Sequence, residues 1–177
     1  MLSYSPIEIL VAGVVLVAAA TDLRARRIPN WLTLFGVCAG LVANSVISGL
    51  QGLETSLLGL AVGFGVYFLF YALRAMGAGD VKLMAAVGAI VGPAHWFVIF
   101  IASSIAGGIF AVVLMLWKGK ARETLFNSFF IAGELAHFRA PYARRSDLDV
   151  KNPEGLRMPH GVAIAAGTMA CLAMALV

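Results

Sequence analysis

Asp22 and Asp80 are the side chains of this sequence best suited to chemistry, because each borders or enters a long apolar run. Two carboxyl groups that face each other cannot both ionise cheaply, so such a pair would hold one proton near neutral pH. The ionised member could then take a proton from water while the protonated member polarises a scissile carbonyl group. An aspartyl hydrolase is therefore one interpretation. Spacing alone leaves it open beside separate roles in helix capping, loop solvation or ion coupling.

The residues around Asp80 indicate that it lies inside the membrane. Gly77 and Gly79 allow the backbone to bend, or to approach another helix, just before it. If the helix that follows reaches the opposite surface at Gly92, Asp80 is 12 residues away, or about 18 Å, which is less than the roughly 30 Å of hydrocarbon. A carboxylate at that depth usually lines a water-filled cavity or a functional site. Lys82 could favour the ionised form of Asp80 or extend to lipid phosphates.

The composition requires a membrane protein. The 177 residues are 61% hydrophobic and 12% charged, whereas soluble domains are about 25% charged. Too few polar residues are present to cover a soluble globule, and a disordered chain or a disulfide scaffold is excluded as well. The net charge of +4 does not imply a nucleic-acid partner, since membrane proteins collect Lys and Arg on the cytoplasmic side. The three histidines lack metal-ligand spacing, and we expect no metal and no cofactor.

Six apolar runs predict an all-α fold with six transmembrane helices, at residues 6–21, 31–50, 53–73, 76–92, 94–117 and 161–177. All 13 Lys and Arg fall in the first, third and fifth connections, around residues 22–30, 74–82 and 118–159. The positive-inside rule then places these connections in the cytoplasm and both termini on the periplasmic side of a bacterial inner membrane. Pairs of glycines four apart, at 36/40, 59/63 and 88/92, predict close helix packing. We treat residues 1–177 as a single membrane domain with a cytoplasmic loop at about 118–159.

Three motifs resemble those of the type IV prepilin peptidases. Asp22-Leu-Arg-Ala-Arg-Arg-Ile28-Pro29-Asn30 is similar to their first catalytic-aspartate motif, and Gly77-Ala-Gly79-Asp80 is similar to the GxGD motif that they share with presenilin-like intramembrane aspartyl proteases. The segment Pro159-His160-Gly161 resembles their last-span signature, although His160 stands where an aromatic residue is expected.

The resemblance implies that Asp22 and Asp80 are the two catalytic aspartates. Gly77, Gly79, Lys82, Pro29 and Asn30 would support them, and we expect Pro29 and Asn30 to end one helix and cap the next. It also implies a substrate, the basic leader peptide of prepilins or pseudopilins, cut at the cytoplasmic face. The chain is similar to the small family members of Flp (tight-adherence) pilus systems, which lack the zinc-binding and methyltransferase region, so no methyltransferase activity is expected.

Two other functions stay open. A small ion-coupled transporter could use Asp80 as a proton or cation site, although the six runs show no internal repeat. A non-catalytic membrane subunit of a pilus assembly machine would need neither aspartate for chemistry.

Overall fold

The computed structural model describes residues 5–73, 76–117 and 160–174. All regular structure in these ranges is α-helical, which confirms the predicted all-α fold for this part of the chain. The helices are α1 (Pro6–Ala25), α2 (Asn30–Ala72), α3 (Ala78–Trp117) and α5 (His160–Ala173). The loop predicted at 118–159 lies outside the described residues.

Three of the helices, α1, α2 and α3, are long and apolar enough to cross a membrane. The 20 residues of α1 are about 30 Å long, which matches the hydrocarbon thickness. Straight helices of 43 and 40 residues would extend about 60 Å or more, roughly twice that thickness. Helix α5 is apolar but has only 14 residues. Helices α2 and α3 therefore fit a bilayer only if the chain turns back within each of them.

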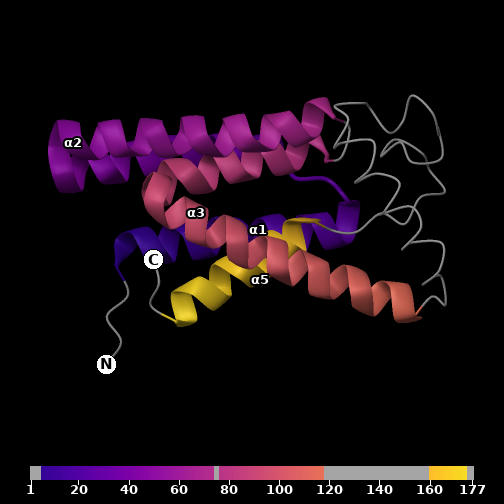
Figure 1. Cartoon of the computed structure of the whole chain (residues 1–177). Coiled ribbons are helices and arrows are strands. Elements are labelled where there is room, and N and C mark those ends of the chain that lie inside the picture. The colour runs from indigo at the N-terminus through magenta and orange to yellow at the C-terminus, as the bar shows by residue number, and fades with distance from the viewer. Residues whose placement is uncertain (1–4, 74–75, 118–159, 175–177) are drawn as a thin grey trace.

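Both long helices do turn back, each at a glycine with a positive φ. Gly49 of α2 has φ 61° and Gly92 of α3 has φ 77°, a region that side-chain-bearing residues rarely adopt. Across the break in α3, Trp96 Nε1 donates a hydrogen bond of 3.0 Å to the carbonyl oxygen of Met84. With α1, α5 and the two halves of each long helix, the described chain thus contains six helical segments. Figure 1 shows the long helices turning back, and the two breaks lie where the predicted apolar runs meet.

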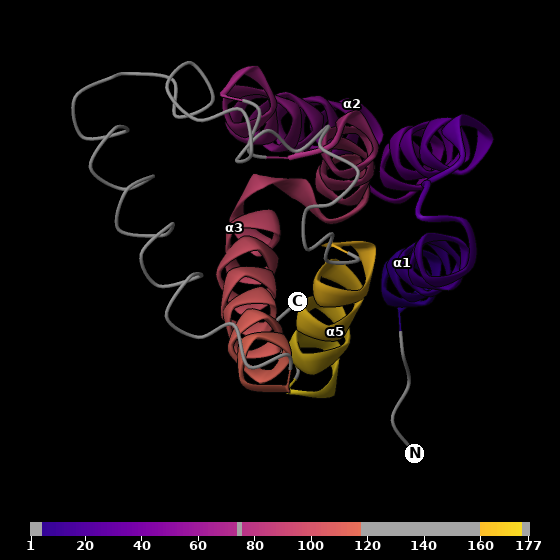
Figure 2. The same ribbon diagram turned by 90° about the vertical axis from the view of Figure 1, so that its right-hand side faces the viewer.

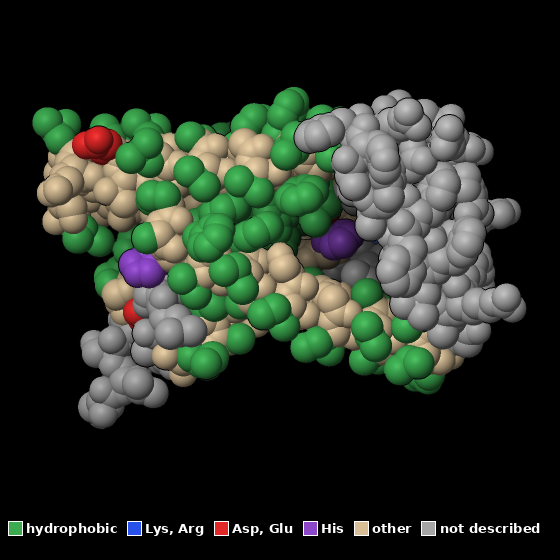
Figure 3. All heavy atoms as spheres, in the orientation of Figure 1, with side chains coloured by type: hydrophobic (Ala, Val, Ile, Leu, Met, Phe, Trp, Pro, Cys, Tyr) green, Lys and Arg blue, Asp and Glu red, His purple; other side chains and the backbone are tan. Residues whose placement is uncertain are grey.

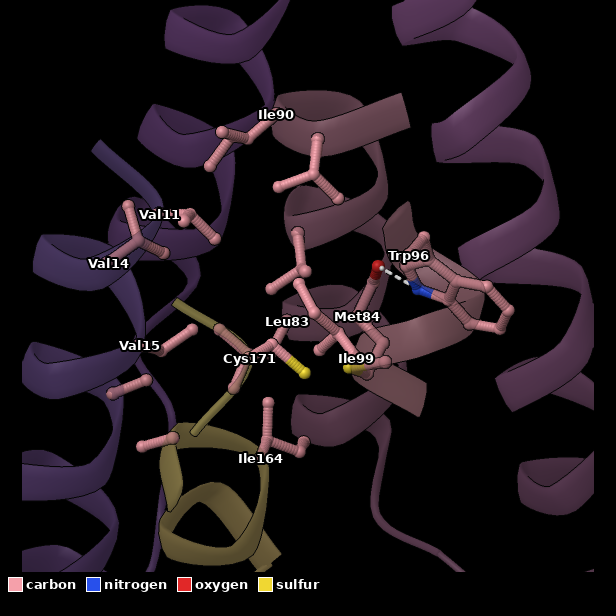
Figure 4. Close-up of a cluster of buried hydrophobic side chains, with 14 of the residues drawn as sticks. Val11, Val14, Val15, Leu83, Met84, Ile90, Trp96, Ile99, Ile164 and Cys171 are labelled. Atoms are coloured by element: carbon pink, nitrogen blue, oxygen red, sulfur yellow. Dashed lines mark hydrogen bonds between the residues drawn. The ribbon is translucent and has the colours of Figure 1, made fainter. Parts of the chain in front are cut away.

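The first half of α3 is the centre of the bundle. Every residue from 83 to 92 is buried, as expected for a helix that is apolar on all sides and surrounded by others. Figure 4 shows Leu83, Met84 and Ile90 of this segment among side chains from α1 and α5, with Trp96 and Ile99 from the second half of α3 beside them. Asp80 lies one turn before this buried stretch, so the bundle core extends up to the carboxyl group.

Glycines let the two halves of α2 approach this central segment closely. In the first half, Gly36 lies against Ala86 and Gly40 lies against the backbone of Ala89, so this half of α2 is parallel to the central segment. In the second half, Gly59 lies against the backbone of Gly88 and Gly63 lies against that of Met84, so this half of α2 is antiparallel to the central segment. The two halves are therefore antiparallel to each other. The close packing predicted from the paired glycines is confirmed at these contacts.

Helix α5 completes the bundle between α1 and α3, as Figure 2 shows. It lies against the second half of α3, where Ser103 Oγ donates a hydrogen bond of 3.4 Å to the carbonyl oxygen of Ile164. Gly167 leaves so little space that a side-chain carbon there would collide with the backbone of Ser103. The first turn of α5 lies beside the end of α1, where Gly161 contacts Asp22.

The outer surface is apolar. In Figure 3 hydrophobic side chains are spread over the described part of the visible face, a few acidic and His side chains are seen among them, and no Lys or Arg is seen there. Large side chains such as Leu34, Val46 and Leu116 are exposed on α2 and α3. Such a surface suits contact with lipid rather than with water.

Candidate active site

Asp22 lies in the last turn of α1, with its side chain turned into the bundle. The carboxyl group is buried, with 8% of the residue exposed. We predicted that the first run ends at residue 21, but α1 continues to Ala25, so Asp22 lies within the last turn instead of ending the helix. Arg26 closes α1 in the left-handed conformation, with its N–H 2.9 Å from the carbonyl oxygen of Asp22. The helix end therefore fixes the backbone of Asp22.

The first turn of α5 meets the Asp22 side chain. The backbone N–H of Gly161 donates a hydrogen bond of 2.8 Å to Asp22 Oδ2. The N–H groups of a first helical turn have no partner within their own helix, and the helix dipole favours an anion there. A side-chain carbon at position 161 would lie only 3.0 Å from Oδ2 and 3.1 Å from Cβ of Asp22. The close approach of Asp22 to α5 therefore depends on a glycine at this position.

Asp80 occupies the first turn of α3 and is 9% exposed. Its N–H donates a hydrogen bond of 3.2 Å to the carbonyl oxygen of Gly77, and a side-chain carbon at position 77 would lie 3.5 Å from Asp80 Oδ2. Asp80 interacts electrostatically with both Asp22 and His160. The structure thus brings the two predicted aspartates together at one end of the bundle, and it adds the first residue of α5 to them.

Two direct contacts join the segment that follows Asp22 to the segment around Asp80. Gly79 lies against the side chain of Ile28, where an added carbon would be 3.4 Å from Ile28 Cβ. Lys82 Nζ donates a hydrogen bond of 2.9 Å to Asn30 Oδ1. Lys82 therefore has a protein partner, which neither of the two interpretations from the sequence included.

Pro29 and Asn30 correct one local expectation. Helix α2 begins at Asn30, with Pro29 in an extended conformation as the residue before it, so the pair does separate two helices. No side chain caps this helix start, however, and the side-chain oxygen Oδ1 of Asn30 accepts a hydrogen bond from Lys82 instead. Asn30 therefore joins two motifs across the site, and the expected capping role was wrong.

Two neighbours of the aspartates were not singled out from the sequence. Gly161 was part of a quoted motif, but nothing in the spacing revealed that its N–H would reach Asp22. Tyr67 lies in an aromatic run and is 3% exposed, and its phenol group interacts electrostatically with Asp80. Its position near Asp80 follows from the packing of α2 against α3, and that packing depends on the turn at Gly49, so the sequence pattern did not reveal it.

Fold and site together define an all-helical membrane protein whose two buried carboxyl groups come from different helices and meet at one end. Residues 9–112 match the type IV leader peptidase family, and this region contains both aspartates and the residues that join them. The chain belongs to this family.

Several curated relatives carry the name prepilin leader peptidase/N-methyltransferase. One from Legionella pneumophila is 35% identical over 126 residues, which are 66% of this chain and 44% of the relative. One from Xanthomonas campestris pv. campestris is 36% identical over 58% of this chain and 38% of its own length. One from Escherichia coli K12 is 31% identical over 68% of this chain and 57% of its own length.

This chain therefore spans about half the length of these relatives. None of the solved structures matches it significantly. Because the relatives are also named N-methyltransferases, the expected lack of that activity stays a prediction.

Proposed function

We propose that this protein is an aspartyl endopeptidase of the membrane that removes the basic leader peptide of prepilins or pseudopilins. One observation carries the proposal. Asp22 and Asp80 come from different helices, are both nearly buried, and interact with each other at one end of the bundle. A pair of buried carboxyl groups near each other is costly to fold and is typical of sites that do chemistry.

In the proposed reaction, the pair shares one proton. The ionised carboxylate takes a proton from water as the water oxygen bonds to the scissile carbonyl carbon. The protonated carboxyl group gives its proton to the carbonyl oxygen, which forms a tetrahedral diol. When the C–N bond breaks, the leaving nitrogen takes a proton from the carboxyl group that received it from water. One hydroxyl group of the diol returns its proton to the other carboxylate, so a carboxylic acid forms and the pair again holds one proton. Residues of the chain supply every proton transfer, so no metal or cofactor is needed.

The distribution of charge supports an orientation. Among the described residues, the Lys and Arg side chains are Arg24, Arg26, Arg27 and Lys82, and all four lie at the end with the aspartates. Glu8 and Glu54 lie toward the opposite end, near the beginning of α1 and the turn in α2. By the positive-inside rule the site faces the cytoplasm of a bacterial inner membrane. The six helical segments would then be six spans, with both termini in the periplasm.

The substrate follows from the family and from this orientation. A basic leader would remain among the headgroups on the cytoplasmic side, where the two aspartates are, while the apolar segment after the cut enters the bilayer. The chain resembles the small family members of Flp pilus systems. This resemblance favours the prepilin of an Flp system as the substrate, and it favours a lack of methyltransferase activity.

The direct test co-expresses the chain with a candidate prepilin and maps the cut by mass spectrometry. We expect Asp22→Asn and Asp80→Asn each to lower cleavage at least about a thousandfold, as loss of a residue from a catalytic unit does. Glu54→Gln is the matched control, because it makes the same change at the opposite end of the bundle and leaves cleavage unchanged. Equal amounts of each variant in the membrane fraction are confirmed by immunoblot.

Other results would favour the alternatives. Cleavage that persists in both normally inserted aspartate variants would contradict the proposed pair and favour a non-catalytic pilus-assembly subunit. Ion flux into liposomes that requires Asp80 but no peptide would favour a transporter.

A further inference from the structure

The contacts of α2 with α3 set a register that leads to Asp80. Along the second half of α2, Gly59 lies against Gly88 and Gly63 lies against Met84. Each step of four residues along α2 is one turn, and it is matched by four residues in the opposite direction along α3. The next step places Tyr67 beside Asp80.

A second observation agrees with this register. The phenol group of Tyr67 is near enough to Asp80 for the carboxylate charge to act on it. Gly63 makes this possible, because any side chain there would collide with the Met84 backbone and separate the two helices.

The ring of Tyr67 is held in place by other aromatic side chains. Its centroid lies 6.0 Å from that of Phe100, 6.4 Å from that of Trp96 and 6.2 Å from that of Phe70, each in an edge-to-face arrangement. Trp96 is fixed in turn by its hydrogen bond to Met84 and by stacking on Phe100. A buried tyrosine with its ring locked on several sides presents its hydroxyl group at a fixed point, at little cost in conformational entropy.

We infer that Tyr67 is a positioning residue for Asp80, with its hydroxyl group donating a hydrogen bond that holds the carboxyl group in the orientation needed for proton transfer. This inference rests on the proposed function. Asp22 already has a donor in the N–H of Gly161, so Tyr67 would give the second aspartate a comparable fixed donor from a different helix. The two carboxyl groups would then be oriented by separate elements and face each other through their remaining oxygens.

The test compares Tyr67→Phe with Tyr71→Phe. Both remove one hydroxyl group from α2, but Tyr71 is one turn further along and 44% exposed. Phenylalanine keeps the ring that packs on Trp96 and Phe100, so we expect unchanged thermal unfolding in detergent. For Tyr67→Phe we expect kcat for prepilin cleavage to fall about tenfold while KM changes by less than about twofold. Tyr71→Phe keeps both constants.

A readout that does not depend on activity is the infrared band of the protonated Asp80 carboxyl group. The band appears on acidification and is assigned by its loss in Asp80→Asn. In Tyr67→Phe we expect it at higher frequency, because the carbonyl group loses a donor, whereas in Tyr71→Phe it does not move.

The outcomes separate this inference from the proposed function. If wild type cleaves the prepilin and Tyr67→Phe matches it in either kcat or band position, Tyr67 does not position Asp80. If wild type cleaves no prepilin, the proposed function fails, and the band alone decides whether Tyr67 contacts Asp80.

Discussion

The two ends of the bundle use buried polar groups in opposite ways. At one end, the buried groups are the side chains of Asp22 and Asp80, and the backbone N–H of Gly161 donates a hydrogen bond to Asp22. At the other end, the buried groups are backbone carbonyl oxygens, and side chains donate hydrogen bonds to them. We call these the aspartate end and the hairpin end.

The break in α3 explains why side-chain donors are needed at the hairpin end. In a regular helix the carbonyl of Ala89 accepts from residue 93, but Pro93 has no N–H, and the break at Gly92 interrupts the next bond as well. Asn44 Nδ2 donates to the carbonyl oxygens of Ala89, at 3.2 Å, and Ile90, at 2.9 Å. Ser56 Oγ also donates to the carbonyl oxygen of Ala89. Both halves of α2 thus supply donors that the turn in α3 lacks.

This difference has a consequence for mutations. At the aspartate end the polar groups are costly to bury and do not hold the fold together, so changes there should affect cleavage more than stability. At the hairpin end the side chains satisfy the backbone, so changes there should affect stability more than cleavage per folded molecule. The following predictions test that separation, beginning with the largest effect.

Gly161→Ala should lower prepilin cleavage about a hundredfold. The added carbon would lie 3.0 Å from Asp22 Oδ2 and would displace the carboxyl group by a few tenths of an ångström or more. Small displacements of catalytic groups can cost about this much. Gly13→Ala is the control, since nothing lies within 4 Å of the position on α1. Equal cleavage by the two variants, measured on the same prepilin, would show that the spacing at Gly161 is unimportant.

Asn44→Leu should lower the free energy of unfolding by about 2 kcal/mol, because it leaves the Ile90 carbonyl without its donor in an apolar interior. Unfolding in mixed micelles measures the change. Ser45→Ala is matched to it, since Ser45 Oγ donates to the carbonyl oxygen of Leu41 one turn earlier in its own helix, and the loss of this bond should cost little. A loss of cleavage per folded molecule in Asn44→Leu would contradict the separation of the two ends.

Lys82→Met and Asn30→Ala should each reduce cleavage by severalfold, and the double variant should be no worse than the worse single variant. The pair joins the two aspartate motifs through one hydrogen bond of 2.9 Å, but both residues are exposed, which limits its strength. A double-mutant cycle on kcat/KM measures the coupling. Additive effects would mean that the contact does not connect the motifs functionally.

The aspartate end and the hairpin end also differ in how far the sequence predicted them. The apolar runs, the breaks near Gly49 and Gly92, and the paired glycines followed from composition and spacing. The pairing of Asp22 with Asp80 was open on physical grounds and came from the resemblance of motifs. Contacts between distant segments, such as Gly161 with Asp22, Lys82 with Asn30 and Asn44 with Ile90, were not predicted. They depend on helix rotation and register, which one residue of slippage would change.

The smallest expected effect concerns Arg26, which lies between Asp22 and the connection to α2. Its φ of 50° is the only positive value of a non-glycine residue in the described part of the chain. The left-handed conformation costs an ordinary residue roughly 1 kcal/mol, and glycine avoids this cost but loses more entropy on folding. Arg26→Gly should therefore change the free energy of unfolding by less than about 1 kcal/mol. Because the N–H that closes α1 is retained, Asp22 should keep its place and cleavage should stay near that of wild type. A large fall in cleavage with unchanged stability would instead mean that the Arg26 side chain binds the leader, and the aspartate end would then include a substrate contact beyond the two carboxyl groups.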